Sequence, residues 1–258
     1  TGAAGAIGAR TAERFCAALC DCLIFVSRAN REEALRLGIG EERRYELIRS
    51  GVDLAAFPAA VADPAGKKAS FGLGMHKPLV TSIGNLKPQK NPADFLVMAQ
   101  AVLRSRPEAR FLFIGDGPLR ERMEGRMIAL GLHGKLALPG WRRDAAEALA
   151  VSDVFVMTSL WEGLPRALVE AMKSGLPPVC YATDGVKDVV RDGENGFLVE
   201  QGDVPALAGR VAQLLADEGL RKRLGAAAAA SIGPEFDIGG MVRSQEELYG
   251  RLLRAAGD

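Results

Sequence analysis

The sequence predicts an α/β protein built around a doubly wound parallel sheet, with a short additional segment at its N-terminal end. Short β-rich apolar runs alternate with longer stretches of helical period, which is typical of βαβ units. Most of those runs end in Gly, Ser or Ala, residues that suit a turn directly after a strand. At 258 residues the chain can bury a substantial core, and it lies near the size at which one domain becomes two.

The predicted strands, in chain order, are 22–27, 45–50, 78–84, 110–115, 135–140, 154–159, 177–182 and 196–200. Helices are expected near 92–106, 118–130, 143–152 and 165–174, followed by a long helical tail that SIGPEF interrupts at 231–236. The last six strands alternate with helices, which is enough for a complete open sheet. The apolar run FCAALCDCLIFV at 15–26 is too short to span a bilayer and contains Asp21, so we expect it to be core.

A shift in composition divides the chain. Residues 57–78 are rich in Pro, Gly and Ala and poor in large apolar residues, which is typical of a linker. The part before it has only two strands and two helices, too little for an independent domain. We therefore expect 1–57 to be the end of another domain with the crossover from it, 58–77 the linker, 78–235 the ligand-binding domain and 236–258 a C-terminal helix.

Charge and cysteine content exclude several kinds of partner. The 33 basic and 32 acidic residues balance, so we expect no nucleic-acid partner, and any anion site must be local. The four cysteines lack the paired CxxC spacing of a zinc site, and we expect reduced thiols and no metal. No positively charged leader precedes the first apolar run, which favours a cytoplasmic protein. Because the sequence does not begin with methionine, we expect that Thr1 is not the natural start.

Ligands of open parallel sheets bind outside the carboxyl ends of the strands. Four turns after predicted strands are therefore expected to open on one edge: NLKPQKN, DGPLRE, WRRD and LWEGLPRALVE. The first supplies Lys87 and Lys90, which can reach an anion, although a single loop lysine is more often solvated. The second lacks the third glycine of the dinucleotide fingerprint, which argues against a dehydrogenase. His76 and His133, in the linker and in a turn, are expected to be structural or exposed.

The fourth turn leads into a helix that begins in WEGLPRALVEAMKSG. Pro165 suits the first helical position, which makes Leu164 the cap and leaves Glu162 in the loop. Because a leucine side chain cannot cap, the N–H groups of 166–168 and the positive end of the helix dipole are open to an acceptor such as a phosphate. Two interpretations of the glutamates stay open: Glu170 forms a surface ion pair with Arg166 while Glu162 is solvated, or both glutamates belong to one binding site.

The run SLWEGLPRALVEAMKSGLPPV resembles the hallmark of the retaining, nucleotide-sugar-dependent glycosyltransferases of family 4, which have the GT-B fold. The two glutamates of that hallmark are Glu162 and Glu170 here. SIGNLKPQKN, FLFIGDGPLRERME, LPGW and DGVKDVVRDGENGFLVEQGD match further family motifs, and CLIFVSRANREEAL with SGVDLAAF resembles the end of the family's N-terminal domain. The resemblance implies a Rossmann-like domain that forms the C-terminal half of a GT-B fold, preceded by a short N-terminal remnant.

The same resemblance implies roles for single residues. Glu162 would face the donor sugar and Lys90 the phosphates, as the catalytic pair, while Glu170 would accept hydrogen bonds from the ribose hydroxyls. Gly140, Trp141 and Arg142 would lie along the nucleobase, with a core position as the alternative for Trp141. The substrate-binding residues that it implies are Glu170, Gly84, Asn85, Lys87, Gly117, Trp141, Arg142, Gly163, Leu164, Pro165 and Arg166.

Two positions and one domain depart from the family pattern. Asn85 stands where the family usually has an arginine, so diphosphate binding is expected to be weaker or shared with Lys87. Asp188 stands where a glutamate is common. The resemblance implies that only the last portion of the acceptor-binding N-terminal domain is represented here, so we expect half of the catalytic site to be missing.

The expected function is therefore the donor-binding half of a retaining hexosyltransferase, inactive alone, that uses a nucleoside diphosphate sugar such as a UDP-sugar and needs no cofactor. Its expected partners are the donor, a glycan or lipid-linked acceptor, and a missing N-terminal domain or partner chain, with self-association through an uncovered apolar face. Such a protein is expected in the cytoplasm or at the inner face of the membrane. The alternatives are a GT-B-fold sugar-nucleotide epimerase, whose members lack this glutamate pair, and a non-catalytic nucleotide-sugar-binding module.

Overall fold

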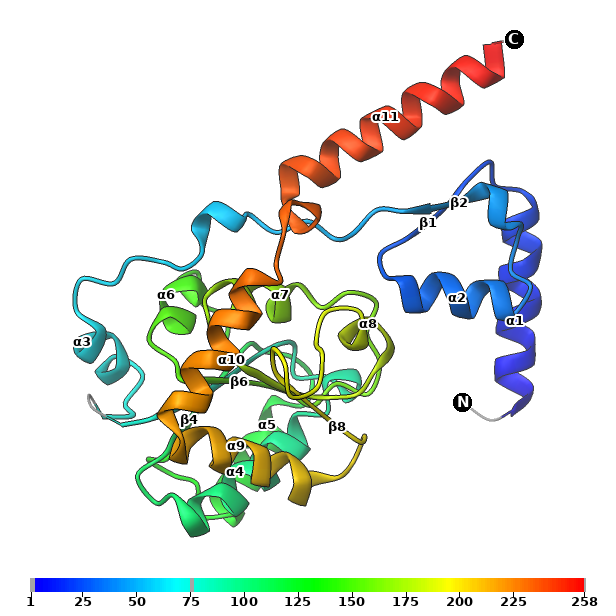
Figure 1. The fold of residues 1–258 in the computed structure, drawn as a ribbon. Coiled ribbons are helices and arrows are strands. Elements are labelled where there is room, and N and C mark those ends of the chain that lie inside the picture. Colours follow the sequence, from blue (N-terminus) through cyan, green and yellow to red (C-terminus); the bar gives the residue numbers. More distant parts are fainter. Residues whose placement is uncertain (1–2, 75–76, 258) are drawn as a thin grey trace.

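The computed structural model describes residues 3–74 and 77–257, with a six-stranded parallel sheet at its centre (Figure 1). The spatial order of the strands is β5-β4-β3-β6-β7-β8. Their bounds are β3 (Leu79–Ile83), β4 (Arg110–Ile114), β5 (Leu136–Ala137), β6 (Val154–Met157), β7 (Pro178–Tyr181) and β8 (Phe197–Val199). This is the doubly wound order: β4 and β5 are added on one side of β3, and β6, β7 and β8 on the other, so the order of the parallel strands reverses between β3 and β6. The predicted fold class is confirmed, and each of the eight predicted strands is found.

Helices cover both faces of the sheet. Figure 1 shows α4 and α9 below it and α6, α7 and α8 above it. Their bounds are α4 (Pro92–Ser105), α5 (Arg120–Ala129), α6 (Ala145–Ala150), α7 (Arg166–Lys173), α8 (Asp184–Lys187), α9 (Val204–Ala216) and α10 (Glu218–Ala230). The long helical tail is broken at Asp217, which caps α10, as well as at the predicted SIGPEF segment, where η4 (Pro234–Phe236) forms.

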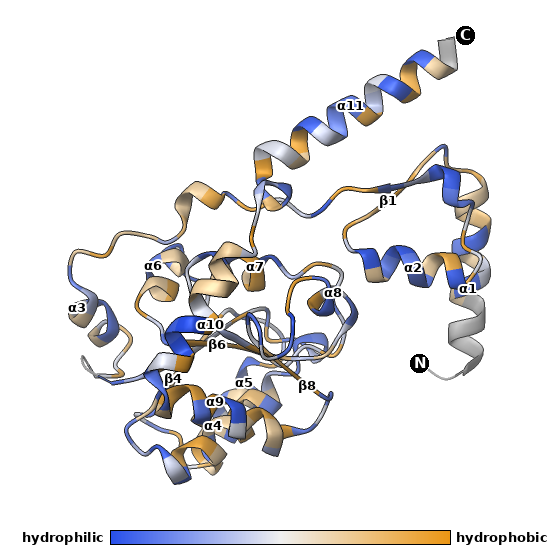
Figure 2. Ribbon diagram, in the orientation of Figure 1, coloured by the Kyte–Doolittle hydropathy of each residue, from blue (hydrophilic) through white to orange (hydrophobic). Residues whose placement is uncertain are grey.

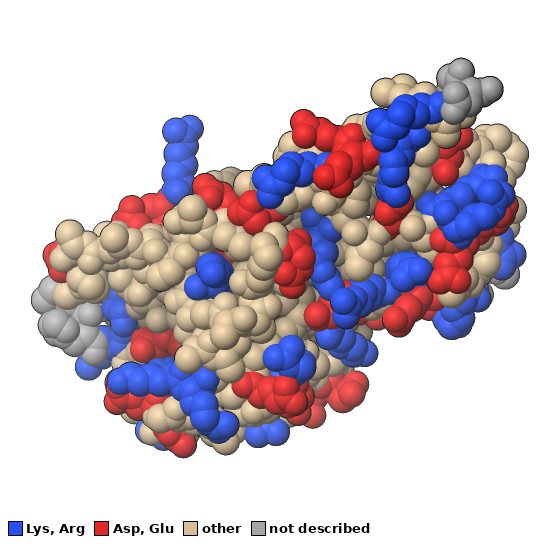
Figure 3. Space-filling model, turned by 45° about the horizontal axis from the view of Figure 1, so that its top comes forward, with Lys and Arg blue, Asp and Glu red and all other residues tan. Residues whose placement is uncertain are grey.

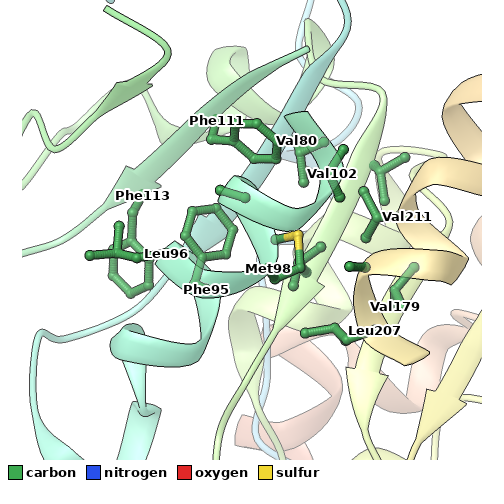
Figure 4. Close-up of a cluster of buried hydrophobic side chains, with 14 of the residues drawn as sticks. Val80, Phe95, Leu96, Met98, Val102, Phe111, Phe113, Val179, Leu207 and Val211 are labelled. Atoms are coloured by element: carbon green, nitrogen blue, oxygen red, sulfur yellow. The ribbon is translucent and has the colours of Figure 1, made fainter. Parts of the chain in front are cut away.

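Alternate residues of each strand fill the two cores. On one face, Val80, Phe111 and Phe113 pack against Phe95 and other residues of α4 and α9 (Figure 4). On the other face, β6 and β7 pack against the apolar side of α7, whose Leu168, Ala171 and Met172 are fully buried. Burial on both faces explains why the strands have continuous apolar sequences, and Figure 2 shows the hydrophobic residues concentrated in these central elements.

The N-terminal segment forms a smaller unit beside the domain. It contains α1 (Ala3–Ala18), β1 (Leu23–Phe25), α2 (Arg28–Arg36), η1 (Glu42–Arg44) and β2 (Tyr45–Leu47), and its two strands pair in parallel. The chain then passes η2 (Leu54–Ala56) to reach the sheet domain, and α11 (Ile238–Gly257) returns to lie along this segment (Figure 1). The amide of Val52 donates to Phe236 O, and the carbonyl of Val52 accepts from Ile238 N. These bonds join the two stretches of chain that connect the N-terminal unit to the sheet domain.

Two expectations about this part need correction. The run at 15–26 is not wholly core, because Phe15 and Leu19 are 66% and 72% exposed at the end of α1; a two-stranded sheet is too small to cover them. A helix, α3 (Pro64–Ala69), lies within the predicted linker, where Asp63 caps it by accepting from Gly66 N. His76 lies outside the described residues, and His133 is exposed in a turn between α5 and β5, as predicted.

The described residues include no helix long and apolar enough to cross a membrane. Basic and acidic side chains are interspersed over the face shown in Figure 3, in keeping with a net charge of +1. A surface of mixed sign has no long-range field to gather an anionic ligand. Any attraction for such a ligand must therefore come from a local arrangement of charges and amides.

Candidate ligand-binding site at the carboxyl edge of the sheet

An ion pair joins the turns that follow the two strands at the reversal point. Lys90 ends η3 (Pro88–Lys90), after β3, and Glu162 follows β6; Lys90 Nζ lies 2.5 Å from Glu162 Oε1. The Glu162 side chain is only 7% exposed and that of Lys90 is 21% exposed. The two residues that the resemblance assigns to catalysis, 72 positions apart in sequence, are thus in direct contact.

The stem of Lys90 crosses the turn at Gly84. Its carbons lie 3.5–3.6 Å from the place that a Cβ on Gly84 would occupy. A side chain larger than a methyl group at position 84 would therefore compete with the lysine for this space. Gly84 thus keeps open the path by which Lys90 reaches Glu162.

The turns after β4 and β5 meet the same edge. Gly115 N donates to Gly140 O at 2.9 Å, and Leu86 N donates to Asp116 O at 2.9 Å. Gly117 has φ +153°, and a Cβ there would lie 2.7 Å from Leu86 O, so only glycine allows this approach. These contacts join the turns, which confirms that they open on one edge.

The turn after β7 packs against the Glu162 loop. A Cβ on Gly185 would lie 1.4 Å from Gly163 O, and Gly185 N donates to Glu162 O at 3.4 Å. A Cβ on Gly163 would meet the Val26 side chain at 3.0 Å, which shows that the N-terminal segment also reaches this loop. The Glu162 loop is therefore enclosed on one side by the turn at Gly185, which tolerates no larger residue, and on the other by the Val26 side chain.

The start of α7 differs by one residue from the prediction. Pro165, with ψ 106°, is the N-cap, Arg166 is the first helical residue, and Leu164 lies buried one position earlier. Leu168 N donates to Pro165 O at 3.0 Å, so it is not free. Within the described residues the amides of Arg166 and Ala167 have no hydrogen-bond acceptor, which leaves two N–H groups for an anion instead of three.

Glu170 lies on α7, one turn beyond Arg166. One of the two interpretations left open requires an ion pair between these residues. In the described part of the chain Glu170 forms no salt bridge, although the charge of Arg166 is close enough to act on it. Burial raises the pKa of the Glu170 carboxyl, and the Arg166 charge opposes that rise only in part. A half-buried carboxylate without a donor is suited to accept hydrogen bonds from a ligand.

The residues that the resemblance assigns to the nucleobase are arranged less completely. Trp141 is 65% exposed, which excludes the core position. Arg142 does not reach the other site residues: its Nε and Nη2 donate to the two carboxylate oxygens of Asp144 at 2.8 and 2.6 Å, and its guanidinium stacks on Phe71 at 5.2 Å. Asp144 in turn pairs with Lys67 of α3, so Arg142 connects the β5 turn to the segment before the sheet.

Two predicted phosphate residues lie at the edge with unengaged side chains. In the described structure no hydrogen bond or ion pair reaches the side chain of exposed Asn85 or half-buried Lys87. The sequence analysis missed Thr183, which follows β7 in the turn that contacts Glu162. Its Oγ1 is buried without a hydrogen-bond partner. A Thr directly after a buried strand, in a turn already matched to the family, was the available signal.

Asp188, which stands where the family commonly has a glutamate, contacts the N-terminal segment. Its carboxylate accepts from Arg28 N at 2.6 Å and Ala29 N at 3.1 Å, at the start of α2, and pairs with Arg49 at 3.3 Å. Both charged side chains of the pair are under 10% exposed. Asp188 therefore fastens the N-terminal segment to the sheet domain beside the Glu162 loop.

The fold and the meeting of these turns define a doubly wound α/β protein with its polar residues gathered where such proteins bind ligands. The family model of the glycosyl transferases group 1 matches residues 66–231. The chain belongs to this family, and its sheet domain corresponds to the C-terminal Rossmann-like domain of the GT-B fold.

Relatives and solved structures agree with this assignment. The chain is 31% identical over 209 residues to UDP-Gal:alpha-D-GlcNAc-diphosphoundecaprenol alpha-1,3-galactosyltransferase of Escherichia coli, covering 80% of this chain and 54% of that one. It is 33% identical over 204 residues to the lipopolysaccharide core biosynthesis glycosyltransferase LpsE of Rhizobium meliloti strain 1021, covering 79% and 56%. The structure of HepE from Anabaena in complex with UDP-glucose superposes with a TM-score of 0.84 at 22% identity, covering 94% and 68%. The chain spans about half the length of the curated relatives it matches.

Proposed function

We propose that this chain is the donor-binding half of a retaining hexosyltransferase that uses a nucleoside diphosphate sugar. The observation that carries the proposal is the buried contact between Lys90 and Glu162, beside the two unbonded amides at the start of α7. An ammonium group and amide N–H groups on one side are suited to a diphosphate, and carboxylates are suited to sugar hydroxyls. Membership of the family and the activities for which the relatives are named support this choice.

The residues divide the donor between them. Lys90 and the amides of Arg166 and Ala167 would meet the charge that develops on the departing diphosphate when its bond to the sugar breaks. Glu162 would face the sugar, and Glu170 would accept from the ribose hydroxyls. Because Lys90 pairs with Glu162 in the free protein, a bound diphosphate would compete with that glutamate for the ammonium group.

A second region is needed to bind the acceptor hydroxyl. The N-terminal segment leaves Phe15, Leu19 and Ile24 exposed, in keeping with a surface that another domain or chain covers. The proposal is therefore that this chain binds donor without transferring sugar, and that it self-associates through these residues. Size-exclusion chromatography of the chain and of a Phe15→Ser, Leu19→Ser variant tests the second point; equal elution of both as monomers would contradict it.

A thermal-shift panel tests the donor class. UDP, GDP and ADP, each with its nucleoside and a matching sugar nucleotide, are added to the folded chain. We expect one diphosphate to raise the melting temperature more than its nucleoside does, because binding to the native state alone stabilises it. Glu162→Ala is expected to reduce the additional effect of the sugar nucleotide, with the nucleoside effect unchanged. A melting temperature that none of the diphosphates changes would sink the proposal.

A further inference from the structure

Asn91, directly after Lys90, has a backbone conformation that calls for an explanation. Its φ is +44° and its ψ is 54°, and it is the only non-glycine residue with positive φ in the described part of the chain. Such a conformation is strained for a residue with a side chain, and asparagine is one of the few that tolerate it. Strained residues persist where the surroundings fix them, and they concentrate at functional sites.

The side chain of Asn91 is held through two further elements. Its Nδ2 donates to Asp94 Oδ2 at 2.7 Å in the first turn of α4, and the Tyr181 hydroxyl of β7 donates to the same oxygen at 2.7 Å. Asn91 is the N-cap of α4, but its side chain makes no capping hydrogen bond. Ordinary helix capping therefore does not explain the asparagine.

Thr158 holds the consecutive main-chain carbonyl groups of Lys90 and Asn91. Thr158 follows β6 and is 2% exposed. Its Oγ1 lies 3.0 Å from the carbonyl oxygen of Lys90 and 3.0 Å from that of Asn91, so its one hydroxyl hydrogen is shared between them. Since Thr158 lies four positions before Glu162, the same stretch of chain fixes the backbone of the lysine and carries its acidic partner.

From these contacts we propose that Asn91 and Thr158 are positioning residues for Lys90. The left-handed turn at Asn91 ends η3, and Pro92 begins α4 immediately after it. Pro92 also disfavours a right-handed helical conformation at Asn91. With the backbone reversed there and bonded to Thr158, the Lys90 stem runs over Gly84 and its ammonium group faces Glu162. The assignment to a diphosphate rests on the proposed function; the placement of Lys90 against Glu162 does not.

The first test needs no ligand. The coupling free energy between Lys90→Met and Glu162→Gln is measured by a double-mutant cycle of urea unfolding. We expect the coupling of the parent to persist in an Asn91→Gly background, because glycine adopts positive φ freely. In an Asn91→Ala background it should fall to within error of zero. Equal coupling in the three backgrounds would overturn the proposal.

Thr158 supplies a second pair of variants, which decides the matter if Asn91→Ala does not fold. Thr158→Ser keeps the hydroxyl and should keep the coupling between Lys90 and Glu162. Thr158→Val has nearly the same shape but leaves the two carbonyl oxygens without a donor, and the coupling should be lost. Coupling that survives in Thr158→Val would equally reject the positioning role.

A binding measurement extends the test to the ligand. Calorimetry with UDP and with uridine is expected to show that Asn91→Ala lowers the affinity for UDP about tenfold, the effect of one charge-assisted contact, while that for uridine is unchanged. Asn91→Gly should restore UDP binding. A purely structural role predicts an unchanged ratio of UDP to uridine affinity, which would contradict the proposal. A parent chain that binds none of UDP, GDP and ADP would defeat the proposed function, and the coupling experiment would still decide the positioning of Lys90.

Discussion

The candidate site has a proposed phosphate side, at Lys90 and Glu162, and a proposed base side, at Trp141 and Arg142. The two sides differ in how many of their side-chain contacts are already formed in the free protein. On the phosphate side, half-buried Lys90 pairs with buried Glu162, and their backbones are held by contacts with Thr158 and Gly185. On the base side, Trp141 projects into solvent and Arg142 is engaged with Asp144 and Phe71, away from the other site residues.

The difference indicates which part of a ligand would have to displace an existing contact of the protein and which part would not. A diphosphate would find the Lys90 ammonium group in place. It would have to displace the Glu162 carboxylate, which lowers the net free energy gained on binding. A nucleobase would meet the exposed ring of Trp141, which makes few contacts with the rest of the protein. Stacking on it would therefore break few contacts of the fold. The predictions below separate the two sides, beginning with the largest effect.

Lys90→Ala is expected to have the largest effect. It removes a charge-assisted contact to the diphosphate, so calorimetry should show UDP affinity reduced roughly ten- to a hundredfold, with uridine affinity nearly unchanged. It also leaves Glu162 buried and unpaired, which should lower the free energy of unfolding by about 3 kcal/mol in urea. Lys87→Ala, whose side chain has no partner in the described structure, is the control for stability. Unchanged UDP binding in Lys90→Ala would place the phosphate site elsewhere.

Asn85→Arg should strengthen the phosphate side. Asn85 is exposed next to Gly84, so an arginine there can add a fork of donors without disturbing the core. We expect UDP to bind roughly tenfold more tightly, with no change for uridine. Asn85→Gln, which stays neutral, is the matched control. Equal tightening for UDP and uridine would show that the arginine acts on the base or on the fold rather than on the phosphates.

The sequence predicted the scaffold well because its patterns are local. Apolar runs, most of them ending in Gly, Ser or Ala, indicated the eight strands, and their alternation with helices indicated the doubly wound class. The start of α7 was displaced by one residue because Pro165 is acceptable both as the first helical residue and, with extended ψ, as the cap. The α3 helix was missed although Asp63 and Pro64 are ordinary start residues, because the surrounding Pro and Gly content indicated a linker.

The site was only partly predictable, because its geometry depends on contacts between distant residues. The resemblance named Lys90 and Glu162, but no local pattern indicates that they pair across 72 positions. Arg142 and Asp144 are two positions apart, so their pairing was open to prediction, whereas the stacking of Arg142 on Phe71 was not. The positive φ of Asn91 has no reliable sequence signal, since asparagine occurs in many conformations.

Glu170→Gln tests the half-buried carboxylate of α7 through the pH dependence of stability. Burial raises the pKa of Glu170 in the folded chain, so the native state binds the extra proton first and its stability falls as pH rises through that pKa. The glutamine variant lacks this titration. Thermal unfolding should therefore show it to be more stable than the parent near about pH 8 and equal to it below about pH 4.

The same residue should report on ribose binding. Uridine affinity of the parent should fall as pH decreases through the raised pKa, because the protonated carboxyl accepts fewer hydrogen bonds, and the glutamine variant should bind several-fold more weakly with little pH dependence. Uridine carries no phosphate that titrates in this range. A variant that binds uridine as tightly as the parent at neutral pH would remove Glu170 from the ribose site.

Trp141→Ala tests the proposed base side by removing its exposed aromatic ring. Because the side chain is largely exposed, the free energy of unfolding should stay within about 0.5 kcal/mol of the parent. Loss of stacking should weaken uridine and UDP by the same factor, roughly tenfold. Trp141→Phe, which keeps an aromatic face, should recover most of the affinity. A loss confined to UDP would instead assign Trp141 to the phosphate side.

Arg142→Ala should have the smallest effect on binding, opposite to the role along the nucleobase that the resemblance implies. The guanidinium holds the pKa of the Asp144 carboxyl well below its usual range through their hydrogen bonds, and it stacks on Phe71. Its removal should lower the free energy of unfolding by about 1 kcal/mol, since the pair is partly exposed. UDP and uridine affinities should change less than twofold. A loss of uridine affinity as large as that of Trp141→Ala, measured by calorimetry on the folded variant, would mean that Arg142 leaves Asp144 when the base binds, and the contrast between the two sides would then hold only for the free protein.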